Sequence, residues 1–200
     1  MKNNTLVIGL TGGIASGKSK VLQGFKKLGA KILDCDSIVH RLLRPGTTIE
    51  SKIIDYFGSS ILGKEGNLNR KALGSIVFSN PKKRKIVEAI IHPEVIRQLK
   101  TKIEQTRSKL LVIDIPLLYE VGLKYLVHKT VVVWVTPSLQ IERLMKRDRL
   151  SLEEAKSRIR TQWPLDKKRK CADFVIDNSN DYSKTRSQIK NLHHILTKNY

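Results

Sequence analysis

The segment Gly12-x-x-x-x-Gly17-Lys18-Ser19 has the spacing of a phosphate-binding loop, or P-loop. Such a loop needs glycines because its backbone N–H groups turn inward around the phosphates, in conformations that a Cβ atom would obstruct. In this pattern the lysine reaches the β- and γ-phosphates and the serine hydroxyl binds Mg²⁺. The sequence therefore predicts an ATP site with Lys18 as a catalytic cation. The loop residues expected to contact ATP are Gly12, Gly13, Ala15, Ser16, Gly17, Lys18, Ser19 and Lys20.

Two acidic residues, Asp34 and Asp36, follow a second apolar segment. Period-two alternation would put both carboxylates on one side of a strand end, where ligands bind in a doubly wound sheet, unless the chain already turns at Asp36. A carboxylate there orients the Mg²⁺ shell or accepts the proton of an attacking hydroxyl. The alternative is that Asp36 only caps the helix expected over Ser37–Leu43.

A third apolar segment, Leu110-Leu-Val-Ile-Asp114, ends in an acid, as a Walker B strand does. Enzymes that hydrolyse ATP often carry a Glu next to that Asp to activate water, but here Ile115 and Pro116 follow. The Asn-Lys-x-Asp motif of GTPases is absent, and the one Asp-x-x-Gly, Asp55–Gly58, lies in a predicted helix. These observations favour phosphoryl transfer to a small molecule over hydrolysis. We expect Ser19 to bind Mg²⁺ together with Asp36 or Asp114, directly or through water.

Arg143 and Arg147 are four residues apart, so both lie on one face of a helix. In a kinase, guanidinium groups placed in this way contact ATP and stabilise the transferring phosphoryl group, beneath a lid that excludes water. Both arginines are therefore expected ATP contacts. The alternative is a solvated basic face, since Lys146 and Arg149 lie beside them.

The elements that must position these residues alternate between strand and helix, which predicts an α/β fold with a five-stranded parallel sheet flanked by helices. Nearly continuous Val, Ile and Leu is typical of strands buried on both faces. Helix signals follow the fourth strand: Thr136 precedes Pro137, and Ser151 and Glu154 form a capping box. The predicted strands are Leu6–Leu10, Lys31–Asp34, Leu110–Ile113, Thr130–Val135 and Phe174–Ile176.

About sixty residues between Gly46 and Arg107 contain helical patterns and no strand-like segment. This is too long for one crossover helix, so an inserted helical subdomain is expected, with a break between two helices at His92-Pro93. Within a single domain over 1–200, the expected parts are a core at about 1–45, 108–142 and 172–200, an insertion at about 46–107 and a helical lid at about 143–171. The expected helices of the insertion include Ile49–Phe57, Arg70–Phe78 and Pro93–Arg107.

The composition is strongly basic, with 38 Lys and Arg against 18 Asp and Glu and a net charge of +20. Such a charge attracts anions, and a P-loop NTPase stimulated by nucleic acid stays open as an alternative. A kinase of another small nucleoside or nucleotide is a second alternative. There is no signal peptide and no apolar segment of the ~20 residues that a membrane span needs, so a cytoplasmic protein is expected. Cys35 and Cys171 show no metal-ligand spacing and are expected to be buried thiols.

The chain resembles the dephospho-CoA kinases from about Leu6 to Asn178. The resemblance rests on an ordered set of motifs, of which the loop alone is shared with many P-loop kinases. The set is Leu10-Thr-Gly-Gly-Ile-Ala-Ser-Gly-Lys-Ser19, Asp34-Cys-Asp36, Arg44-Pro-Gly46, Phe57-Gly58, Leu68-Asn-Arg70, Ile76-Val-Phe78, Ile91-His-Pro93, Asp114-Ile-Pro-Leu-Leu118 with Glu120, Gln140-Ile-Glu-Arg143, Arg147-Asp148, Arg158, Gln162 and Ala172-Asp-Phe-Val-Ile-Asp-Asn178.

The resemblance implies ATP- and Mg²⁺-dependent phosphorylation of the ribose 3′-hydroxyl of dephospho-CoA, giving coenzyme A and ADP. It implies that the insertion binds the CoA moiety, that Asp36 is the catalytic base and that Arg143 is the lid arginine. Arg70 falls on a substrate-side arginine, and Asp34 and Leu117 are further expected substrate contacts. The implied partners are ATP and dephospho-CoA, with no membrane, no obligatory nucleic acid, and a monomer or small homo-oligomer.

Two positions depart from the family pattern. Lys20 stands where the family usually has Thr, which puts a contact from that hydroxyl to the nucleotide in question. Asn69 stands where the family more commonly has Asp, beside Arg70. The second change affects local hydrogen bonds of the insertion and leaves the arginine in place.

Overall fold

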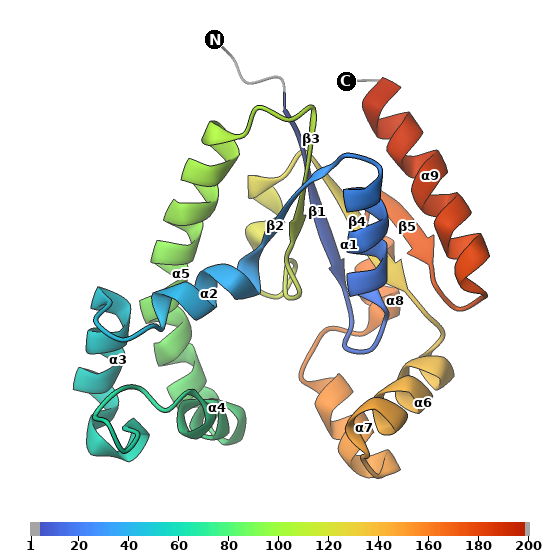
Figure 1. Cartoon of the computed structure of the whole chain (residues 1–200). Helices are drawn as coiled ribbons and strands as arrows, with labels where there is room; N and C mark the ends of the chain where they lie inside the picture. The colour runs from blue at the N-terminus through green and yellow to red at the C-terminus, as the bar shows by residue number, and fades with distance from the viewer. Residues whose placement is uncertain (1–4, 199–200) are drawn as a thin grey trace. The chain divides into compact units, whose positions relative to one another are not determined.

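The computed structural model describes residues 5–198, so the ends of the predicted core, 1–4 and 199–200, lie outside the described residues. The first compact unit consists of the chain up to Asp34 and from Gln105 onward. Its strands form a parallel sheet in the order β2-β3-β1-β4-β5 (Figure 1). The predicted α/β class and all five predicted strands are confirmed. The strands are β1 Leu6–Gly12, β2 Lys31–Asp34, β3 Leu110–Asp114, β4 Lys129–Trp134 and β5 Phe174–Asp177.

The centre of the sheet is β1, and every residue of it is buried. Its partner β3 is paired with it up to Leu10 and Asp114, and β2 is paired with β3 up to Asp34 and Asp114. Because register partners in parallel strands point to the same face, Asp34 and Asp114 lie side by side where β2 and β3 end. The phosphate loop follows at the same edge, after Gly12.

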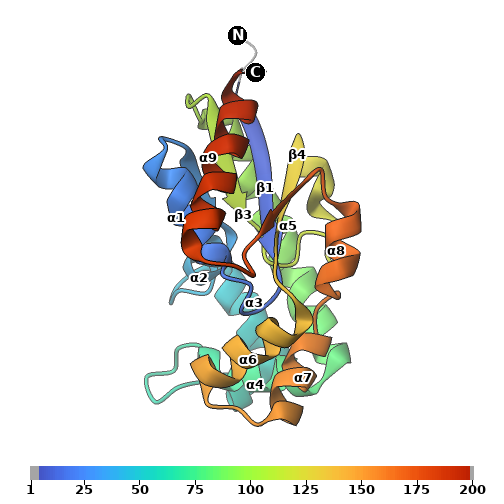
Figure 2. The same cartoon turned by 90° about the vertical axis from the view of Figure 1, so that its right-hand side faces the viewer.

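Helices cover both faces of this sheet. On one face, α1 and α9 pack on β1, β3 and β4, with Phe25 and Ile189 fully buried (Figure 2). On the other face, Leu165 at the start of α8 packs against Val132 and Val135. The helices of this unit are α1 Lys18–Lys27, α6 Pro137–Asp148, α7 Leu152–Arg160, α8 Leu165–Cys171 and α9 Tyr182–Lys198, with a 3₁₀ helix, η2, at Leu123–Leu126.

The predicted helix signals are confirmed. The Thr136 hydroxyl accepts a hydrogen bond from Leu139 N, and Pro137 opens α6. Ser151 and Glu154 form both hydrogen bonds of a capping box at the start of α7. The additional helix α8 had no clear sequence signal, because it is short and most of its residues are charged.

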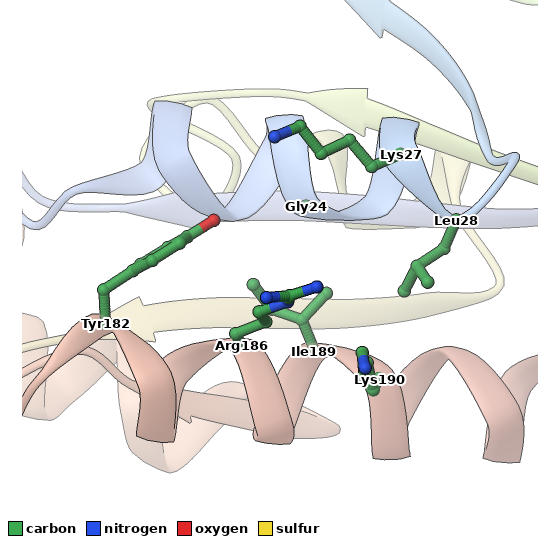
Figure 3. A pocket seen from close by; sticks show the side chains of 7 residues that line it. All are labelled: Gly24, Lys27, Leu28, Tyr182, Arg186, Ile189 and Lys190. Atoms are coloured by element: carbon green, nitrogen blue, oxygen red, sulfur yellow. The ribbon is translucent and has the colours of Figure 1, made fainter.

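The contact between α1 and α9 depends on Gly24. A Cβ atom there would lie 2.8 Å from Ile189 Cδ1, so the glycine lets the two helices approach closely. A shallow hollow of about 240 Å³ remains beside this contact, with Tyr182, Arg186 and Lys190 on α9 facing it (Figure 3). At its end nearest the phosphate loop, the Lys20 ammonium lies 5.9 Å from the centre of the Tyr182 ring. Lys20 thus contributes to the packing of α9 against α1.

The second compact unit, Cys35–Glu104, is helical, and it begins well before the boundary expected near 46. Its regular elements are α2 Cys35–Leu42, α3 Thr48–Phe57, η1 Gly58–Ile61, α4 Arg70–Ser79 and α5 Pro81–Gln105, the last of which ends one residue beyond the unit. Within this part of the described chain, β pairing is limited to one isolated bridge between Leu62 and Leu68.

The predicted helix break at His92-Pro93 is wrong, because α5 runs through Pro93. Proline removes one backbone hydrogen bond and disfavours a helix interior. Val87, Ile91, Val95 and Leu99 are all buried and recur every four residues on either side of it. This continuous apolar stripe gains more from packing than the single proline costs.

Two further predictions need correction. The strand β2 ends at Asp34 and α2 begins at Cys35, so Asp36 lies in the first turn of a helix rather than in period-two alternation with Asp34. Cys35 is buried as expected, but Cys171 is exposed at the end of α8. Among residues 5–198, no helix is both long and apolar enough to cross a membrane.

Asp173 ties the edge strand to β4, since its carboxylate accepts hydrogen bonds from Thr130 N at 2.9 Å and Thr130 Oγ1 at 2.7 Å. Burial raises the pKa of Asp173, but these hydrogen bonds and the charge of Lys129 outweigh burial and hold the pKa below its usual value. A carboxyl with a lowered pKa stabilises the fold above its unfolded pKa, and this contribution is lost as the pH falls through the folded pKa.

We expect Asp173→Asn to lower the free energy of unfolding by about 1 kcal/mol at pH 7. At a pH below the lowered folded pKa of Asp173, where the natural carboxyl is protonated, the difference from the natural protein is expected to disappear. Urea unfolding at both pH values measures it. A difference that does not change with pH would show that the charge of Asp173 is unimportant.

Candidate active site

The phosphate loop lies between the end of β1 and the start of α1. Gly17 has a φ of 85° and immediately precedes α1, and a Cβ atom at this position would collide with the Asn178 amide nitrogen. Both the backbone conformation and the close approach therefore require glycine. Backbone N–H groups at the start of a helix, such as those that open α1, are the kind of site that binds phosphate.

Three amide side chains hold the loop backbone from outside. The Ile14 N–H donates to Gln162 Oε1 at 2.8 Å, and Gln140 Nε2 donates to the Ile14 carbonyl at 2.9 Å. Asn178 Nδ2 donates to the Ser16 carbonyl at 2.9 Å, and Thr185 on α9 holds the same amide through its oxygen. The loop conformation is thus fixed by hydrogen bonds from α6, from the segment before α8 and from the segment after β5.

Lys18 forms an ion pair with Asp114 at the end of β3. Both side chains are largely withdrawn from solvent, and they join the first turn of α1 to the neighbouring strand end. The hydroxyl of Ser16 is buried and has no hydrogen-bond partner in the described part of the chain. The loop therefore carries a cation and a polar atom that a bound phosphate could engage.

The two predicted arginines have different neighbours in the structure. Arg143 Nη1 lies 4.0 Å from the position that a Cβ atom on Gly17 would take, so its guanidinium lies beside the loop. Arg147 instead donates two hydrogen bonds to Asp148, at 2.8 and 3.1 Å, and these bonds raise the pKa of the arginine. Arg158 Nη1 donates to the same carboxylate at 2.9 Å. Arg143 therefore lies beside the loop, and the guanidinium of Arg147 is held by Asp148.

Lys168 is a residue that the sequence analysis missed. Its side chain is fully buried, and its ammonium donates to the carbonyls of Gly12 and Pro116 and pairs with Glu120. Burial lowers the pKa of Lys168, and the adjacent Glu120 carboxylate opposes that shift. In the sequence, Lys168 is one of four consecutive basic residues, 167–170, and nothing in that pattern distinguishes it from its exposed neighbours.

Other predicted site residues belong to the helical unit and are described within it. Asp36 lies in the first turn of α2. Arg70 Nη2 donates to the carbonyls of His40 and Leu43, at 2.8 and 3.1 Å, where α2 ends. Asn69 Oδ1 accepts hydrogen bonds from the backbone N–H groups of Lys71 and Ala72 in the first turn of α4, both at 3.1 Å. Asparagine here caps α4 as an aspartate would, so this departure from the family pattern keeps the helix start.

Leu117, an expected substrate contact, belongs to the sheet unit. It is half-buried just after Pro116, and its carbonyl accepts a hydrogen bond from Val121 N at 3.0 Å. The turn that carries it follows directly from the end of β3.

The sheet order, the glycine loop between β1 and α1, and the lysine and arginine beside that loop place the protein among the P-loop kinases. The family model described as dephospho-CoA kinase matches residues 6–184. The chain belongs to the dephospho-CoA kinase family, and it is a phosphotransferase.

Known relatives agree with this over nearly the whole chain. A dephospho-CoA kinase from Bacillus licheniformis is 48% identical over 191 residues, which are 94% of this chain and 95% of the relative. The crystal structure of TT1252 from Thermus thermophilus is 35% identical, covers 96% of this chain and 98% of that chain, and gives a TM-score of 0.83. The structure of a dephospho-CoA kinase from Campylobacter jejuni is 31% identical, covers 98% of this chain and 99% of that one, and gives a TM-score of 0.66.

Proposed function

We propose that the chain transfers the γ-phosphoryl group of ATP to the ribose 3′-hydroxyl of dephospho-CoA, using Lys18, Asp36 and Arg143. Dephospho-CoA kinase activity is the final step of coenzyme A biosynthesis. The observation that carries the proposal is the match of residues 6–184 to the family. The geometry of the phosphate loop supports the roles of individual residues.

The loop and the cations beside it would bind the triphosphate. Backbone N–H groups at the end of the loop and the start of α1, from Gly17 to Ser19, would surround the β- and γ-phosphates, and Lys18 would exchange Asp114 for a phosphate oxygen. Arg143, already beside Gly17, would approach the γ-phosphate as negative charge develops on it. Arg147 would contribute only if it left Asp148. The exposed Lys20 would add positive charge at the edge of the site.

Asp36 is proposed as the base that accepts the proton of the 3′-hydroxyl. The hydroxyl oxygen would form a bond to the γ-phosphorus while the bond from that phosphorus to the β-phosphate bridging oxygen breaks. The proton would pass to the Asp36 carboxylate and then to solvent, and ADP would leave. Asp36 lies in the first turn of α2, two residues after the end of β2.

The residues present fit a magnesium ion. Mg²⁺ takes oxygen ligands and usually keeps waters, so it needs only one or two protein groups besides the phosphates. The Ser19 hydroxyl, with the carboxylate of Asp114 or Asp36, supplies such oxygens. The described residues contain no group of three or more His, Cys, Asp or Glu side chains that could hold a metal ion by themselves. The bound ion would neutralise charge on the phosphates.

The helical unit is proposed to bind the remainder of dephospho-CoA. It contains a hollow of about 840 Å³ between α3 and α5, with Lys52 and Arg97 among its lining residues. Arg70 in this unit, with Asp34 and Leu117 from the other, are the proposed substrate contacts. Residues 143–171 are the proposed lid, and the buried Lys168 would be its fixed end.

A coupled assay of ADP release tests the activity. With dephospho-CoA we expect ADP formation that requires Mg²⁺ and stops when EDTA removes it, because the ion offsets the charge of the phosphates. A panel with adenosine, AMP and shikimate as acceptors is the control for specificity. Faster turnover with any of these than with dephospho-CoA would contradict the proposed acceptor.

A further inference from the structure

The ammonium of Lys168 has three acceptors, which match its three N–H donors. They are the Gly12 carbonyl at 3.1 Å, the Pro116 carbonyl at 3.0 Å and Glu120 Oε1 at 2.8 Å. A lysine is rarely buried completely, because its charge loses the solvation of water. Full satisfaction by two carbonyls and one carboxylate is what makes the burial of Lys168 tolerable.

The two carbonyls lie where the strands β1 and β3 end, next to the phosphate loop. Gly12 is the last residue of β1 and the first glycine of the phosphate loop, and Pro116 lies two residues after Asp114. The pairing of β1 with β3 ends at Leu10 and Asp114, and the Ile115 N–H donates to the Leu10 carbonyl just beyond it. Beyond this point, side-chain hydrogen bonds connect the two segments that leave the strands. Lys168 donates to the Gly12 and Pro116 carbonyls, and the Thr11 hydroxyl donates to the Pro116 carbonyl at 3.0 Å.

Glu120 connects this contact to a second residue of the proposed lid, Trp163. Its Oε1 atom also accepts a hydrogen bond from Trp163 N at 2.9 Å, and Trp163 stacks on Tyr119. Because Lys168 donates to the carbonyl of Gly12, the ion pair of Lys168 and Glu120 lies against the first residue of the loop.

We propose that Lys168 is a positioning residue for phosphoryl transfer: by holding the Gly12 and Pro116 carbonyls it fixes the first glycine of the phosphate loop relative to the strand end that carries Asp114. Lys168 contacts no substrate and acts through the loop. The inference rests on the phosphate-binding role proposed for that loop. It predicts that loss of Lys168 weakens binding of the phosphates specifically, rather than binding of the nucleoside.

Lys168→Met is the direct test, with the dissociation constants for ADP and for adenosine measured by calorimetry. We expect the Kd for ADP to rise about tenfold or more and the Kd for adenosine to stay as in the natural protein. Lys170→Met is the matched control, since Lys170 is an exposed lysine on the same helix, and it is expected to change neither constant. Unchanged ADP affinity in Lys168→Met would overturn the proposal.

A double variant separates positioning from stability. Lys168→Met alone leaves the Glu120 carboxylate in the interior without its counter-ion, which destabilises the fold. In Lys168→Met/Glu120→Gln that charge is gone, and the new amide oxygen can still accept from Trp163 N. We expect thermal stability to recover while the Kd for ADP stays raised. Recovery of ADP affinity together with stability would show a purely structural role.

In the same experiment, the affinities of the natural protein for ADP and adenosine test the phosphate-binding role of the loop. If it did not bind ADP more tightly than adenosine, the phosphate-binding role of the loop would be wrong, and the proposed function would fail with it. If it does, and Lys168→Met binds ADP equally well, only the role of Lys168 is wrong.

Discussion

Asp36→Asn is expected to lower turnover with dephospho-CoA by about 10²–10⁴-fold and to leave the affinity for ATP nearly unchanged. The substitution keeps the size and polarity of the side chain but removes its ability to accept a proton. The proposed base acts on the acceptor hydroxyl, which ATP binding does not involve. An interaction made mainly in the transition state lowers kcat and kcat/KM together, and that pattern is what we expect.

Steady-state kinetics with both substrates, and calorimetry with ATP, measure these effects. Asp55→Asn is the matched control, because Asp55 is an exposed acid on α3 of the same helical unit, and it is expected to retain full turnover. If Asp36→Asn kept a near-natural rate, Asp36 would not be the base. A large loss of ATP affinity would instead indicate that Asp36 mainly binds the metal ion.

Much of the sheet unit could be predicted from the sequence because its signals are local. Continuous Val, Ile and Leu in segments such as Val131–Val133 marks strands buried on both faces, and the structure confirms each of them. The loop was predictable because glycine at position 17 is required by backbone conformation. The capping residues Thr136 and Ser151 each act within a single helical turn. Such features do not depend on distant parts of the chain.

The features that the sequence did not predict depend on contacts between distant residues. The helix α5 continues through Pro93 because of what its apolar stripe packs against, which a local rule for proline cannot include. In the sequence, Lys168 is one of four consecutive basic residues. It is buried because its partners, Glu120 and two backbone carbonyls, come from parts of the chain that are distant in sequence. Arg147 donates to its neighbour Asp148, and helical periodicity alone does not predict that contact.

Lys18→Met is expected to lower turnover by about 10³-fold or more and, unlike Asp36→Asn, to weaken ATP binding as well. Lys18 is the one lysine of the loop whose ammonium is paired with a strand-end carboxylate in the described structure. Its removal takes a positive charge from the proposed position of the β- and γ-phosphates. It also leaves the negative charge of Asp114 facing that position, so binding of the triphosphate is opposed by repulsion as well as by the lost attraction.

A double variant divides these two contributions. In Lys18→Met/Asp114→Asn the repelling carboxylate is neutralised, so we expect ATP affinity to recover in part, because repulsion acts on the bound ground state. Turnover is expected to stay low, since no cation remains to stabilise the charge on the transferring phosphoryl group. Lys26→Met, an exposed lysine on the same helix, is the control for a change in overall charge. Recovery of turnover in the double variant would mean that Lys18 serves only to neutralise Asp114, and the catalytic role proposed for it would then be wrong.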